Sequence, residues 1–403
     1  MSMAEKVTDV GAGPWARLAA EAGRLQVLYQ QGRREETLAA VQECRTTMAG
    51  LDEPQDADPA AAPWMIRESI LGLGVLVAHD LGEWAQALDL NGAVRQSQQD
   101  RRATEVELAV TMFNDYGPLL RLGQAADARD LLYQCRAIFG RAEDVVMMGN
   151  TLSALADADA HRGHVTSAVD EETDALRMKY RGTDPEAIAV SHYNLANYLM
   201  SATSERQAVW AHRLAAAVIR YQTGSPRLTT SIQSIGRLVG NQNGLEPPQS
   251  PLSFNDVCLF LDSMREVRFA ELFATLPARA ESGQAAIDEV MRLTADIRDS
   301  AIEQSVAAWE PIISALVAAR QPETADEVTP LLDDALAELS KSPVWSELVT
   351  VLQRIQAGPG FHDDRTVDDL DPVSASVARR ARSALAGEFT VDPTAWRALA
   401  EDD

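Results

Sequence analysis

The feature that most constrains this chain is a spaced group of small residues that recurs about every 40 positions in its first half. A glycine opens each of four copies, and small or slim residues follow it five and twelve positions later. The glycines are Gly32, Gly82, Gly123 and Gly163. A fifth copy keeps the two later positions as Ala208 and Ala215 but has Thr203 in place of glycine, so successive copies lie 50, 41, 40 and 40 residues apart. A fixed period in this range predicts a repeat array whose units pack mainly on their neighbours.

Each copy predicts two helices joined by a tight turn. Apolar residues with helical spacing precede the glycine, as Leu73, Leu76 and Val77 do before Gly82. The glycine ends the first helix, since it adopts the left-handed conformation without a Cβ penalty. The later small residues lie seven apart on one face of the second helix, where they permit close packing. These residues are Thr37, Cys44, Ala87, Val94, Ala128, Cys135, Ala168 and Ala175.

The fifth copy resembles a known family. Asn194-Leu195-Ala196-Asn197, followed by the small residues at 208 and 215, resembles the tetratricopeptide repeat. The run from Gly182 through Asp184-Pro185 resembles the longer repeat of kinesin light chains, which a period near 40 also favours. The resemblance covers roughly residues 15–245. It implies an all-α fold, namely a right-handed α-solenoid of helix-turn-helix repeats followed by a C-terminal helical domain.

Proline-rich stretches suggest how the chain is divided. Three prolines at 247, 248 and 251 prevent a helix from crossing that stretch. We therefore predict a disordered N-terminus at 1–12 and an array of five repeats plus a degenerate sixth at 13–245. A C-terminal helical domain or cap should follow at 246–357, and an acidic linker with a terminal helix at 358–403.

The charge of the chain argues against two classes of partner. The net charge is −24 and the pI is about 4.6. General binding to nucleic acid or to an anionic membrane requires a basic face, so neither is expected. We interpret the clusters Arg101-Arg102 and Arg379–Arg382 as solvated helix faces. No stretch has the length and hydropathy of a membrane span or a signal peptide, which predicts a cytoplasmic protein. The near-absence of lysine beside many arginines indicates a bacterial source.

The known catalytic motifs are missing from the sequence. It has no phosphate-binding loop, no nucleophile elbow and no dinucleotide-binding glycine motif. Its three cysteines are too scattered for a disulfide framework or a zinc site. His161 and His164 lack a third ligand nearby and are interpreted as a solvated turn. We expect no catalytic residue, no metal and no cofactor.

The resemblance also implies where a partner would bind. In tetratricopeptide repeats, Asn positions on the first helices face the concave groove, where an amide can both donate to and accept from a peptide backbone. Asn194 and Asn197 fill these positions in the fifth repeat. Asn114 fills the first position in the third repeat, Asp157 fills the second in the fourth, and Tyr193 flanks them. An equally weighted alternative is that these side chains only bond between adjacent repeats.

Three hypotheses of function follow. The first is a non-catalytic module that binds a protein or peptide partner in the groove, with an oligomeric state that the sequence does not determine. The second is a sensor or regulatory subunit of a bacterial signalling or defence-like system that acts with a separate effector. The third, given the least weight, is a helical enzyme with its site in residues 253–403.

Overall fold

The structure is a computed structural model of the 403-residue chain. It describes residues 13–51, 62–182, 184–202, 206–239, 252–357, 367 and 370–400. Throughout these ranges the regular elements are helices and there is no strand, which confirms the all-α prediction. The N-terminus predicted as disordered and most of the acidic linker lie outside the described residues. Among the described helices, none combines the length and the apolar character that a membrane crossing requires.

The chain divides into two compact units. The N-terminal unit comprises residues 1–231 and 244–287, and the C-terminal unit comprises 232–243 and 288–403. The sequence predicts a boundary near residue 245. Helices α14 (Phe254–Asp262) and α15 (Phe269–Thr275) follow that point but belong to the N-terminal unit, where α14 packs on the last repeat.

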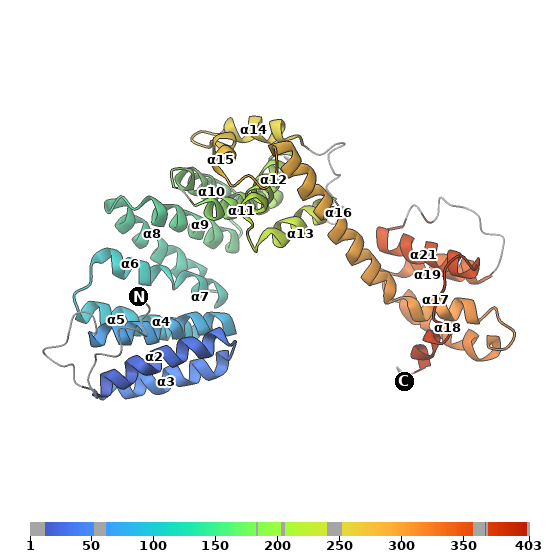
Figure 1. The fold of residues 1–403 in the computed structure, drawn as a ribbon, viewed down its shortest axis with the longest axis horizontal. Coiled ribbons are helices and arrows are strands. Elements are labelled where there is room, and N and C mark those ends of the chain that lie inside the picture. Colours follow the sequence, from blue (N-terminus) through green and yellow to red (C-terminus); the bar gives the residue numbers. More distant parts are fainter. Residues whose placement is uncertain are drawn as a thin grey trace. The chain divides into compact units, whose positions relative to one another are not determined.

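Successive helices of the N-terminal unit stack side by side in sequence order (Figure 1). Within a repeat, the first helix packs on the second, and each second helix packs on the first helix of the following repeat. In the third repeat two short helices, α6 and α7, together take the place of a single first helix. The helices are α2 (Pro14–Gln30), α3 (Arg34–Ala49), α4 (Pro63–Leu81), α5 (Trp84–Asp100), α6 (Glu105–Phe113), α7 (Tyr116–Arg121), α8 (Ala125–Arg141), α9 (Val145–His161), α10 (Val165–Tyr180), α11 (Pro185–Ala202) and α12 (Arg206–Thr223). This pairing agrees with the predicted hairpins, while the right-handed superhelix stays a prediction.

The recurring glycines end the first helices as the sequence predicts. Gly32, Gly82, Gly123 and Gly163 have φ angles of +76°, +75°, +76° and +79°, in the left-handed region. The small residues that follow are buried: Ala128, Ala168 and Ala175, for example, are 0% exposed. The turn and the close helix contact therefore come from the same short sequence pattern.

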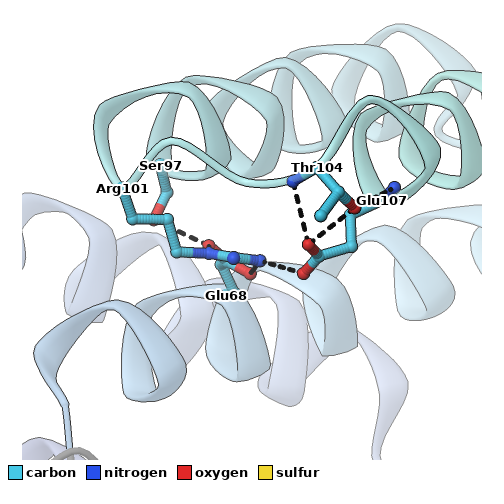
Figure 2. Close-up of polar contacts among 5 residues, drawn as sticks. All are labelled: Glu68, Ser97, Arg101, Thr104 and Glu107. Carbon is cyan, nitrogen blue, oxygen red and sulfur yellow. Dashed lines mark hydrogen bonds and ion pairs between the residues drawn. The ribbon is translucent and has the colours of Figure 1, made fainter.

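An ion cluster connects the second repeat to the third (Figure 2). Arg101, which directly follows α5, donates from Nε to Glu68 Oε1 of α4 at 2.8 Å and from Nη2 to Glu107 Oε1 of α6 at 2.8 Å. Glu107 also caps α6, because its Oε2 accepts from the Thr104 backbone N–H at 3.0 Å. These hydrogen bonds from Thr104 and Arg101 lower the pKa of Glu107 to about 2. The Arg101 side chain is only 19% exposed, so its interpretation as part of a solvated face is wrong.

The C-terminal unit has its own apolar core. Its helices include α16 (Gly283–Ala307), α17 (Glu310–Ala318), α18 (Ala325–Ser340), α19 (Ser346–Ala357), α21 (Pro372–Leu385) and the 3₁₀ helix η3 (Ala395–Ala400), and α13 (Leu228–Val239) contributes most of its length. Leu332, Leu336 and Leu352 are fully buried in this core. The ring centroids of Trp309 and Trp345 lie 5.2 Å apart. Within the described residues of either unit, no group of three or more His, Cys, Asp or Glu side chains is placed to hold a metal.

The turn glycines can be tested by alanine substitution. Gly163→Ala should destabilise the protein by about 1 kcal/mol, because a Cβ is disfavoured in the left-handed region although space is open around it. Gly23→Ala, inside α2 and equally open, should instead stabilise the protein by about 0.4–1 kcal/mol. Urea unfolding measures both, and equal effects of the two substitutions would contradict the account.

The ion cluster can be tested at its cation. Arg101→Met should lower the free energy of unfolding by about 2 kcal/mol, because Glu68 is left largely buried without its counter-ion. Arg102→Met removes a neighbouring, exposed arginine and should change stability by less than about 0.5 kcal/mol. If both variants unfold at the same urea concentration, Arg101 does not stabilise this junction.

Candidate functional site

A polar cavity lies in the N-terminal unit where the first helices of three successive repeats meet. We call it the groove cavity. It has a volume of about 320 Å³. Its walls come from α6, α7, α9 and α11, with one residue from α10. The lining residues are Phe113, Tyr116, Asn150, Ser153, Ala154, Asp157, Lys179, Val190, Asn194 and Tyr198.

Two of the five predicted site residues line this cavity. Asp157 of the fourth repeat and Asn194 of the fifth are both there. Asn197 and Tyr193 instead contact α12 of their own repeat: Asn197 Oδ1 accepts from Arg213 Nη2 at 2.5 Å, and the Arg213 guanidinium lies 4.6 Å from the Tyr193 ring centroid. These two side chains therefore connect the two helices of one repeat, whereas the alternative interpretation expected bonds between adjacent repeats.

Asn114, the fifth predicted residue, lies outside the cavity. It is exposed at the C-cap of α6, where the first helix of the third repeat is interrupted. Next to it, buried Asp115 accepts a hydrogen bond from Asn91 Nδ2 at 2.6 Å and forms an ion pair with Arg95. Both partners belong to α5, so contacts with the preceding repeat hold the interrupted segment in place.

The fourth repeat contains a buried polar network around Lys179 and Glu172 that the sequence interpretation missed. Lys179 Nζ donates to Ser153 Oγ at 2.7 Å and to Ser191 Oγ at 2.8 Å, and Ser153 Oγ donates to Glu172 Oε1 at 2.9 Å. Burial lowers the pKa of Lys179 and raises that of Glu172, while the charge of each opposes the shift of the other. A signal was present in the sequence: Lys179 is one of only three lysines, and it follows Glu172 by seven positions on one helix.

Asp157 contributes a carboxylate to the groove cavity. Among the described residues, this carboxylate makes no ion pair with a buried cation. Its nearest partner is His161, one turn later on α9, whose Nδ1 lies 3.3 Å from Asp157 Oδ1; both side chains are more than 40% exposed. Burial of the Asp157 carboxyl within the unit raises its pKa, although His161 and Arg121 act in the opposite direction. The charges of Asp157 and Glu172 also raise the pKa of Tyr116 and Tyr198, secondary to burial, so these rings lie within the electrostatic reach of both carboxylates.

A pair of buried histidines lies in the fifth repeat. His192 Nδ1 and His212 Nδ1 are 2.8 Å apart, and His192 Nε2 lies 2.9 Å from the Tyr180 hydroxyl. Burial lowers the pKa of both rings, that of His212 to about 3, so both are neutral at pH 7. One Nδ1 therefore carries the proton and donates to the other. His192 is 0% exposed, so it has no surface from which to contact a ligand.

No protein-family model matches this chain, and no curated protein does. The likeness to tetratricopeptide repeats therefore stays a prediction that depends on the quoted residues.

The histidine pair predicts a specific pH dependence. The folded-state pKa of His212 lies below the unfolded value of about 6.5, so the unfolded chain binds more protons as the pH falls. His212 should therefore remove about 2 kcal/mol of stability between pH 7.5 and pH 5. Partly buried acids such as Glu171, whose pKa burial raises to about 7, contribute with the opposite sign.

Because contributions of both signs overlap, the test compares variants at two pH values. The destabilisation caused by His212→Asn should be about 2 kcal/mol smaller at pH 5 than at pH 7.5, since the variant has no imidazole to protonate on unfolding. Gln134→Ala, at an exposed residue that does not titrate, should show no such difference. Urea unfolding at the two pH values measures the destabilisation of each variant. If the destabilisation by His212→Asn is the same at pH 5 and pH 7.5, His212 is not neutral in the folded protein, contrary to what we infer.

Proposed function

We propose that the protein is a non-catalytic binding module that holds an extended segment of a partner protein along the first helices of its repeat array. One observation carries this proposal: residues from the first helices of three successive repeats converge on a single polar cavity. Such convergence gives a partner chain several polar contacts as it crosses from one repeat to the next.

The residue types in the cavity suit a peptide backbone. Asn150 and Asn194 each carry an amide that can donate to a carbonyl and accept from an N–H of an extended chain. These contacts do not depend on the side chains of the partner, so they provide affinity without strict sequence demand. Aromatic rings from Tyr116 and Tyr198 add apolar contact surface beside them.

The overall charge supports a protein partner over a nucleic acid. The net charge of −24 disfavours a phosphate backbone, and the resemblance to tetratricopeptide repeats favours peptide recognition. The same proposal places the protein in a bacterial cytoplasm, and its arginine-rich composition supports the bacterial source.

The test is selection of binding peptides from a random phage-displayed library, followed by affinity measurements on the double variant Asn150→Ala plus Asn194→Ala. We expect the selected peptides to bind this variant at least about tenfold more weakly, a loss of about 1.4 kcal/mol or more. Gln134→Ala, an exposed amide on the second helix α8, is the matched control and should bind as the wild type does. Equal binding by the double variant, with its melting temperature unchanged, would rule out the groove cavity as the peptide site.

A further inference from the structure

The groove cavity is large enough to admit a side chain of a bound segment. Its volume of about 320 Å³ lies near the lower end of the roughly 300–1,000 Å³ typical of ligand pockets. Its walls combine aromatic rings with amide, hydroxyl and carboxylate groups. A single partner side chain that enters from a segment lying across the first helices would therefore contact several of these groups at once.

The charges around the cavity are unequally compensated. The Lys179 ammonium is linked to the Glu172 carboxyl through Ser153 in the same buried network, and it donates hydrogen bonds to Ser153 and Ser191. Asp157 has no comparable buried partner, since His161 is 44% exposed and carries a charge only when protonated. The Asp157 carboxylate is therefore the anion of the cavity that lacks a buried counter-ion and has lost part of its hydration.

The neighbours of Asp157 also suit a cation. Tyr116 and Tyr198 line the cavity on either side of the fourth repeat, one from α7 and one from α11. The faces of such rings attract an ammonium or guanidinium group, and the attraction strengthens when the cation is shielded from water. The side-chain oxygens of Asn150 and Asn194 can accept hydrogen bonds from the same cation.

We infer that the groove cavity takes a cationic side chain, lysine or arginine, of the partner segment, with Asp157 as its counter-ion and Tyr116 and Tyr198 as its aromatic walls. This inference rests on the proposed function, because it names the side chain by which the partner is anchored. It also gives the module a sequence preference that backbone contacts with Asn150 and Asn194 do not supply. An acidic or apolar side chain at this position would leave Asp157 without a counter-ion.

The experiment uses four short peptides of the form acetyl-Ala-Ala-Xaa-Ala-Ala-amide, in which Xaa is lysine, arginine, norleucine or glutamate. Binding to the full chain is followed by NMR through the side-chain amide signals of Asn150 and Asn194 after selective ¹⁵N-asparagine labelling. We expect the lysine and arginine peptides to shift these signals saturably, with a Kd on the order of 1 mM at low salt and weaker binding at high salt. Whichever of these two peptides binds more tightly shows whether an ammonium or a guanidinium group fits the cavity better.

Two variants complete the test. Asp157→Asn keeps the shape of the side chain and should weaken binding of the cationic peptides at least about tenfold. Asp130→Asn removes one exposed charge on α8, outside the cavity, and should leave binding unchanged apart from a small effect of net charge.

The possible outcomes separate this inference from the proposed function. If the norleucine peptide binds as tightly as the lysine peptide, or if Asp157→Asn binds like the wild type, the cation site is refuted while peptide binding in the groove stands. If no peptide shifts the two amide signals, the cation site is also refuted, and the library selection then decides the proposed function independently. If the glutamate peptide binds best, the cavity selects an anion and the inference is reversed.

Discussion

The structure of the N-terminal unit depends on how closely its helices approach one another. A helical hairpin has an apolar face that it cannot bury alone, so each repeat is stabilised by its neighbours. Small residues make the required contact possible: Ala168 and Ala175 are both 0% exposed on α10, and a Cβ on Gly74 of α4 would meet Val41 Cγ1 at 2.6 Å. The stacking that follows brings the first helices of successive repeats together, and the groove cavity results from that arrangement.

Charge is distributed unevenly within this stack. Lys179 and Glu172 are both buried beside the cavity, and the hydroxyl of Ser153 links them by hydrogen bonds. We interpret this pair as a structural element that positions Ser153 at the cavity wall. Asp157, by contrast, is partly exposed and has no buried cation, which leaves it available to a ligand. Two ionisable groups of one cavity therefore have different roles because of their different partners.

The helices and turns of the array could be predicted from the sequence because their determinants are local. Glycine in a left-handed turn and small residues seven apart act within a single hairpin, so Gly82 and Gly163 were placed correctly. The interruption between α6 and α7 also has a local determinant, which the sequence interpretation did not use: Pro118, in the first turn of α7, has no N–H with which to continue the helix from α6. The bonds of Asp115 to Asn91 and Arg95 of the preceding repeat, by contrast, are not indicated by the neighbouring sequence.

The predicted site residues also differ in how far contacts with other helices determine their positions. The resemblance identified Asp157 and Asn194, which both line the cavity although they fill different positions of the repeat, the second and the first. Asn197 lies three residues after Asn194 and bonds to Arg213 instead, a choice set by the side chain that α12 places opposite it. Lys179 and Ser153 were missed because they are joined to each other and to Ser191 of the next repeat by hydrogen bonds that form only when the helices stack.

The most direct test of a peptide-binding groove is a crystal structure of the full chain bound to its tightest library-selected peptide. The account predicts an extended peptide across α7, α9 and α11, with its backbone bonded to the side-chain amides of Asn150 and Asn194. A peptide bound instead to the outer surface of the second helices, such as α8 and α10, with the groove cavity left empty, would contradict it.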